Sequence, residues 1–241
     1  MADIHANALA LTACLHHAAE RGAERYVFLG DLVGYGADSA AVLDIVMRHT
    51  EAGAVTLLGN HDEAIAKSSA YFNETAQTAL DLARQQLTAE HKRFLTQLPL
   101  QWCDGGECYV HASAASPERW PYIDSPAAAR RCVDAAQAVH TFCGHVHNQV
   151  LYFENAQGRM SEFRPVAGTA IPVPGHRRWL AAVGSVGQPR DRNPAAAYAL
   201  FDRGREKLTF YRVAYDATAA AQRIRRSGLP EWLAHRVELG I

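Results

Sequence analysis

Apolar segments of two kinds alternate along the first sixty residues. At 7–21 apolar side chains recur with helical spacing, and Gly22 suits the end of a helix. Residues 26–29 form a short run of aromatic, β-branched and aliphatic side chains, which is typical of a buried strand. A predicted helix at 39–49 separates this run from a second one at 55–58. Strand, helix and strand in this order predict a βαβ unit with parallel strands.

The rest of the chain divides into a helical stretch, a region of short strands and a helical tail. Residues 73–98 are mainly helical, and Pro99 ends this stretch. Further helices are expected at 126–138, 217–226 and 231–236. Parallel units first and hairpins later predict an α/β (α+β) fold, with two mixed sheets packed together and helices outside. The strands expected in this half of the chain are 100–103, 108–111, 139–143, 150–154, 160–163, 179–183, 197–201 and 207–214.

Polar side chains follow several of these apolar runs directly. The run at 55–58 ends in Gly59-Asn60-His61-Asp62, which by itself suits an ordinary polar turn. The same pattern, an apolar run followed directly by polar side chains, recurs along the chain. Open α/β folds place their ligand sites at the carboxyl ends of strands. We therefore expect the side chains at these ends to share one rim. They are Asp3, His5, Asp31, Asn60, His61, Asp62, His111, His145 and His147.

The residue types at this rim indicate a metal site. A lone histidine after a strand is more often a polar exit residue than a ligand. Five histidines with aspartates and an asparagine need another explanation, because unpaired buried polar groups are costly. Asp, His and Asn together suit divalent Mn, Fe, Zn or Ni. In Asp3-x-His5 and His145-x-His147 the two side chains fall on one face of an extended chain.

The order of these motifs resembles that of the calcineurin-like metallophosphoesterases, in particular a small bacterial and archaeal branch that is phosphodiesterase- or phosphatase-like. The resemblance implies a four-layer αββα metallophosphoesterase sandwich. The resemblance covers most of the first 147 residues. It extends to the sequence Gly184-Ser185-Val186-Gly187-Gln188-Pro189-Arg190. The matching motifs are Asp3-Ile4-His5, Gly30-Asp31-Leu32-Val33-Gly34, Gly59-Asn60-His61-Asp62, His111 and Gly144-His145-Val146-His147.

The resemblance also implies two divalent metal ions, bridged by Asp31, that activate a bridging hydroxide for attack on phosphorus. The expected substrate is a small phosphorylated molecule, either a phosphodiester or a phosphomonoester. One ion would be held by Asp3, His5, Asp31 and His147, and the other by Asp31, Asn60, His111 and His145.

Four residues are expected to act on the substrate. His61 follows the ligand Asn60 and is the expected proton donor to the leaving oxygen. Asp62 would orient His61 and raise its pKa, or cap the following helix, or do both. Arg190 is the expected phosphate contact beside Asn60, because a guanidinium pairs with phosphate through two hydrogen bonds. The alternative for Arg190 is a solvated surface arginine.

Composition narrows the setting of this chemistry. With 24 basic and 25 acidic residues, the net charge of -1 gives no strong signal for nucleic acid. No apolar run approaches a membrane span, and no signal peptide is recognisable, so a cytoplasmic location is expected. At 241 residues we expect a single domain over 1–241, with a helical insert at 63–100 and C-terminal helices at 216–241.

The five cysteines are expected to be reduced thiols, since their number is odd and no export signal is recognisable. Cys103 and Cys108 flank a plausible hairpin turn, so a disulfide between them is the alternative.

Two features leave alternatives open. Only Met1 and Ala2 precede Asp3, where family members have an apolar strand, so the N-terminal strand is expected to be missing or truncated. Our hypothesis is a start codon upstream; if Met1 is the start, Asp3 and His5 should drift and bind their ion weakly. The alternative function is a non-catalytic scaffold or binding protein with the metallophosphoesterase fold.

Overall fold

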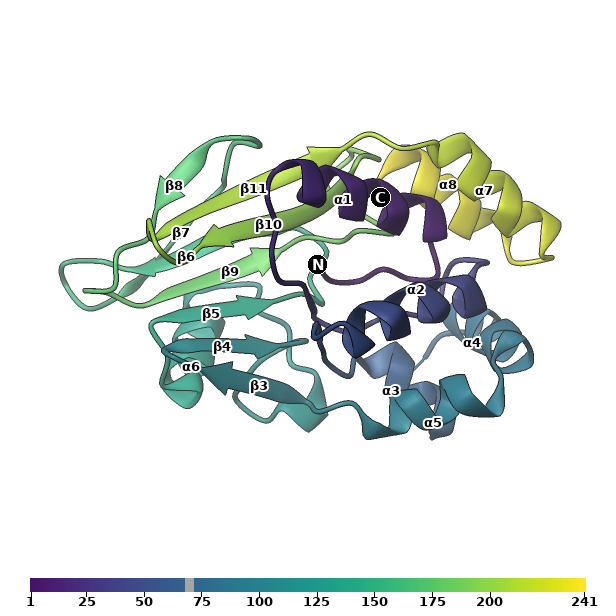
Figure 1. Ribbon diagram of the computed structural model, residues 1–241, viewed down its shortest axis with the longest axis horizontal. Helices are drawn as coiled ribbons and strands as arrows, with labels where there is room; N and C mark the ends of the chain where they lie inside the picture. Colours follow the sequence, from purple (N-terminus) through teal and green to yellow (C-terminus); the bar gives the residue numbers. More distant parts are fainter. Residues whose placement is uncertain (68–71) are drawn as a thin grey trace.

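A six-stranded mixed sheet forms one half of the protein (Figure 1). The computed structural model describes residues 1–67 and 72–241. In this sheet β5 pairs in parallel with both β4 and β9, whereas β3–β4, β6–β9 and β6–β7 are antiparallel. Its strands, in spatial order, are β3 (Gln101–Asp104), β4 (Glu107–Val110), β5 (His140–Cys143), β9 (Trp179–Val183), β6 (Gln149–Glu154) and β7 (Met160–Phe163).

The second sheet is assembled from two groups of strands. The parallel pair β1 (Val27–Phe28) and β2 (Val55–Thr56) confirms the predicted βαβ unit. The antiparallel group contains β10 (Ala196–Asp202), β11 (Lys207–Val213) and β8 (Ala170–Pro172), in that order. Backbone hydrogen bonds through 1–3 and 185–187 connect the two groups, from β1 to β10.

Helices cover the outer faces of both sheets. The helices α1 (Ala8–Glu20) and α2 (Ser39–Glu51) pack on the second sheet, and α6 (Pro126–Ala136) packs on the first. A separate apolar cluster, with Leu57, Leu151 and Phe210 at its centre, fills the space between the sheets. The predicted four-layer αββα order is therefore confirmed. The other helices are α3 (Asn60–Ala66), α4 (Glu74–Gln86), α5 (Ala89–Gln97), the 3₁₀ turn η1 (Pro117–Arg119), α7 (Ala217–Arg226) and α8 (Glu231–Leu239).

The N-terminal residues are held despite the absence of an assigned strand. The backbone N–H of Leu29 donates to the carbonyl of Met1 at 2.8 Å, and that of Asp3 donates to Gly30 at 3.1 Å. On the other side, the N–H groups of Val186 and Gly187 donate to Ala2 and Asp3. Asp3 is 0% exposed, so the expectation that it drifts is wrong.

The expectation of reduced thiols is wrong for one cysteine pair. The antiparallel register of β3 and β4 places Cys103 directly opposite Cys108, and their sulfur atoms are bonded. The other three cysteines, Cys14, Cys132 and Cys143, are free and buried.

Among the described helices, none combines the length and apolarity needed to cross a membrane.

Candidate metal centre

The predicted rim residues meet where the strands of both sheets end. Asp31 follows β1, Asn60 begins α3, and His111 follows β4. His145 and His147 follow β5, and the loop before α1 contributes Asp3 and His5. All of them except the half-buried Asn60 are buried. The structure thus brings together every metal ligand that the sequence predicts.

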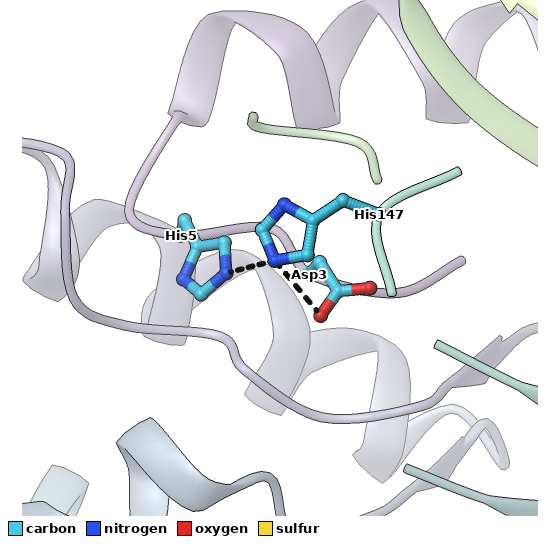
Figure 2. A group of neighbouring side chains, drawn as sticks. All are labelled: Asp3, His5 and His147. Atoms are coloured by element: carbon cyan, nitrogen blue, oxygen red, sulfur yellow. Dashed lines mark hydrogen bonds and ion pairs between the residues drawn. The ribbon is translucent and has the colours of Figure 1, made fainter. Parts of the chain in front are cut away.

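The first cluster contains Asp3, His5 and His147, whose ligand atoms all lie within 4.8 Å of one another (Figure 2). The Nε2 atoms of the two histidines are 3.1 Å apart, and Nε2 of His147 is 3.6 Å from Oδ1 of Asp3. Their other ring nitrogens contact backbone carbonyls: Nδ1 of His5 that of Val33 at 3.1 Å, and Nδ1 of His147 that of Gln188 at 2.6 Å. Nδ1 must carry the proton to donate there, so both Nε2 lone pairs face the cluster.

The second cluster contains Asp31, His111 and His145, again with ligand atoms within 4.8 Å of one another. Nε2 of His111 lies 3.4 Å from Oδ2 of Asp31 and 3.1 Å from Oδ1 of Asn60. Nδ1 of His111 contacts the backbone carbonyl of Leu29 at 2.8 Å, so this ring is oriented like those of the first cluster.

Asp31 belongs to the second cluster and also faces His5 of the first. Its Oδ2 atom is 3.7 Å from Nε2 of His5 and 3.4 Å from Nε2 of His111. Its Oδ1 atom accepts the backbone N–H of His61 at 2.9 Å, which fixes the carboxylate. This is the position that a bridging carboxylate requires.

The buried groups of the centre differ in their protonation, and His111 must lose its proton before it can bind a metal ion. Burial lowers the pKa of His5 and of His147 well below the usual value, so both rings are neutral ligands at pH 7. Burial also opposes the charge of His111, but the neighbouring Asp31 carboxylate outweighs it and raises the pKa of His111 to about 9. Burial would raise the pKa of Asp31, but His111, His61 and His5 together hold it well below its usual range. The negative charge of Asp31 is therefore kept at the centre.

Left-handed backbone conformations are concentrated at this rim. The φ angles of Asp3, His5, Asp31, His145 and His147 lie between 46° and 67°, although none of these residues is glycine. Such conformations are unfavourable for most side chains and persist where the surrounding structure enforces them. These backbone conformations orient five predicted ligand side chains, all from loops, toward the same centre.

His61 lies beside both clusters without a hydrogen-bond partner for Nδ1 among the described residues. Its ring contacts those of His5, Tyr35 and Phe72, with centroids 4.9, 4.5 and 4.7 Å away. A Cβ at position 34 would collide with Nδ1 of His61, so Gly34 is required for this packing. Burial lowers the pKa of His61 to about 4.

Asp62 contacts backbone groups rather than the ring of His61. Its Oδ1 atom accepts the N–H groups of Leu32 and Val33 at 2.9 and 3.2 Å, and Oδ2 accepts that of Gly59 at 3.0 Å. The last bond caps α3. Of the two roles expected for Asp62, the contacts favour the cap, and they extend it to a clamp on the loop that bears Asp31.

Several side chains near the centre were not predicted as part of it. The ring of Tyr122 stacks on that of His145 with centroids 4.1 Å apart, and Trp120 contacts His111 edge-on at 5.6 Å. Tyr35 contacts His5 at 4.7 Å. The predicted Arg190 lies 5.9 Å from the Tyr35 ring, measured from its guanidinium carbon. No local pattern marks these aromatic residues, because only the fold places their loops against the histidines.

The donor set fits divalent ions. Nε2 of His145 is buried and has no hydrogen-bond partner among residues 1–67 and 72–241. Nε2 of His145 and the inward-facing Nε2 lone pairs of His5 and His147 are therefore available to a bound cation. Imidazole, carboxylate and amide donors together suit borderline metals such as Mn, Fe, Zn or Ni.

Comparison with known proteins agrees with this geometry. A protein of Methanocaldococcus jannaschii described as uncharacterized, MJ0912, is 31% identical, and the alignment covers 100% of this chain and 96% of that protein. The crystal structure of a metallophosphoesterase from Sphaerobacter thermophilus matches with a TM-score of 0.90 at 33% identity, covering 100% of this chain and 97% of that one. A hypothetical protein of Pyrococcus horikoshii OT3, PH1004, shares the fold with a TM-score of 0.81 at 20% identity and the same coverage.

The family comparison covers most of the chain and includes every rim residue. Residues 1–206 match the calcineurin-like phosphoesterase superfamily domain. By its motifs, its fold and this match, the chain belongs to the calcineurin-like phosphoesterase superfamily.

Proposed function

We propose that this protein hydrolyses a small phosphomonoester or phosphodiester with the help of two divalent metal ions. The observation that supports the proposal is the pair of ligand clusters, in which Asp31 of the second also faces His5 of the first. Asp3, His5 and His147 would hold one ion with Asp31. Asn60, His111 and His145 would hold the other with Asp31. When bound, the two ions would polarise the phosphoryl oxygens and acidify the attacking water.

The protein's own residues then position and protonate the substrate. His61 would give a proton to the leaving oxygen, and the position of its ring beside His5 and Asp31 supports this role. Burial favours its neutral form, and an anionic substrate beside the ring favours the protonated form by the opposite charge. Asn60 and Arg190 would contact phosphate oxygens of the substrate. Asp62 would keep the loops of Asp31 and Asn60 in register.

The test compares His61→Ala with the unchanged protein on bis-p-nitrophenyl phosphate and p-nitrophenyl phosphate, with Mn, Ni or Mg added. We expect metal-dependent turnover of at least one substrate, and a loss of about 10²–10⁴-fold in kcat for His61→Ala, since that is the usual contribution of a positioned acid. The exposed His176 provides the control His176→Ala, which should keep full activity. The absence of metal-dependent turnover of both substrates, or undiminished turnover in His61→Ala, contradicts the proposal and favours a non-catalytic scaffold.

A further inference from the structure

Two arginines that are distant in sequence meet at one aromatic ring beside the metal centre. Arg190 belongs to the segment after β9, and Arg236 belongs to α8. The guanidinium carbon of each lies 5.9 Å from the centre of the Tyr35 ring. Both contacts are within the range at which a cation is attracted to an aromatic ring.

No Asp or Glu side chain among the described residues forms an ion pair with Arg190 or Arg236, although Arg236 contacts the main-chain oxygen of Ile241, the last residue of the sequence. Arg190 donates from Nη2 to Oε1 of Gln188 at 3.2 Å, and its Nε is buried without a partner. Arg236 donates from Nε to the backbone carbonyl of Ile241 at 2.7 Å. By contrast, Arg212 and Arg225 each form an ion pair at 2.8 Å. The Arg190–Arg236 pair therefore retains its positive charge.

The two positively charged arginines lie close to the metal centre. Burial lowers the pKa of Arg236, and the charge of Arg190 lowers it further, so the two guanidinium groups repel each other. The shared Tyr35 ring lies 4.7 Å from the ring of His5 and 4.5 Å from that of His61. One aromatic ring thus separates the arginine pair from the catalytic histidine and a metal ligand.

We propose that Arg190 and Arg236 bind a second phosphate group of the substrate, linked to the phosphate that is hydrolysed. This inference rests on the proposed function and narrows its substrate class to molecules with two neighbouring phosphates. The two metal ions would neutralise the phosphate under attack, which leaves the arginine pair for another anion. Guanidinium groups suit this role because each offers two parallel N–H donors to a phosphate. An anion between them would relieve their mutual repulsion and supply the missing partner of Nε of Arg190.

The test measures binding with two non-hydrolysable probes that differ by one phosphonate group. Methylenediphosphonate and methylphosphonate are titrated calorimetrically into the Mn-loaded protein at saturating free Mn. We expect Arg236→Met to weaken binding of methylenediphosphonate about tenfold or more, the usual loss for one charge-assisted contact, and that of methylphosphonate less than about twofold. The control Arg226→Met removes an exposed arginine of α7 and should change neither.

A second variant separates charge from structure. Arg236→Met and Arg236→Lys both lose the Nε contact with Ile241, but only lysine keeps the charge. We therefore expect Arg236→Lys to retain part of the preference for methylenediphosphonate. Equal losses in these two variants, equal losses for both probes, or an equal loss in Arg226→Met would overturn the inference. Because no turnover is needed, an inactive protein with an Arg236-dependent preference rejects the proposed function alone. An active protein without this preference rejects the inference alone.

Discussion

At the scale of single residues, Asp62 shows how neighbours in sequence can have separate tasks. It directly follows His61, and an orienting role for its carboxylate is a natural prediction. In the structure both oxygens are used by backbone N–H groups of Leu32, Val33 and Gly59. Asp62 is 1% exposed, so these donors have no access to water. The carboxylate therefore joins two loops that each bear a predicted metal ligand.

Removing this carboxylate should destabilise the fold. Asp62→Ala leaves three buried N–H groups unpaired, each of which costs about 1–3 kcal/mol. We expect the free energy of unfolding in urea to fall by about 3 kcal/mol or more. Asp62→Asn should cost less, because its amide oxygen still accepts from one loop. The exposed Asp104→Ala serves as the control. A loss below about 1 kcal/mol in Asp62→Ala would show that the clamp is dispensable.

At the scale of elements, hydrophobic periodicity located most helices and strands, and the errors have local causes. The predicted 39–49 and 126–138 helices correspond to α2 and α6. The predictions missed β8, because Ala170–Pro172 is only three residues long and has no alternation to detect. They also began the helical insert at residue 63, whereas α3 begins at Asn60, and Asp62 accepts the N–H of Gly59 at its start. Short elements depend on their neighbours more than on their own pattern.

A charged network attaches α6 to the first sheet. Glu154 at the end of β6 binds Arg178 and Arg130, and Arg130 belongs to α6. Hydrogen bonds from Arg178 and then Arg130 lower the pKa of Glu154 from 4.5 to about 2. A depressed pKa stabilises the folded state above the unfolded value, and this contribution disappears as the pH falls through the folded value.

The pH dependence of unfolding tests this network. Glu154→Gln should lower the free energy of unfolding at pH 7 by less than about 1 kcal/mol, since solvent screens an exposed pair. The difference between this variant and the unchanged protein should shrink as the pH falls from about 4.5 to about 2. Urea unfolding across this range measures it. A difference that stays constant with pH would mean that packing, rather than charge, connects these elements.

At the scale of the whole molecule, the metal centre is where the two sheets and the N-terminal loop converge. Asp3 and His147 are 144 residues apart in the sequence, and Nε2 of His147 lies 3.6 Å from Oδ1 of Asp3. His111 follows β4 of one sheet, and Asp31 follows β1 of the other. Ions bound here would connect both layers and stabilise only the folded chain.

Chelation should therefore lower the thermal stability. Removal of one ion present at about 100 times its dissociation constant costs about 2.7 kcal/mol, which corresponds to a Tm about 5–10 °C lower per ion for a protein of this size. Differential scanning calorimetry with and without a chelator measures the shift. The double variant Asp3→Ala/His147→Ala lacks two of the three residues of the first cluster and should show a smaller shift. An unchanged Tm after chelation would argue against ions that connect the two sheets.

By itself, the sequence predicted the candidate ligands and the layers of the fold. Each ligand lies next to an apolar run or a glycine, and a strand end delivers such side chains to one rim wherever the sheets are placed. Only the tertiary structure decided which partners they meet. In the fold, Arg236 of the last helix lies against the Tyr35 ring, and the Asp62 carboxylate contacts backbone N–H groups rather than His61. These contacts join distant segments through loops with left-handed backbone, and no local pattern of residues encodes where such loops lead.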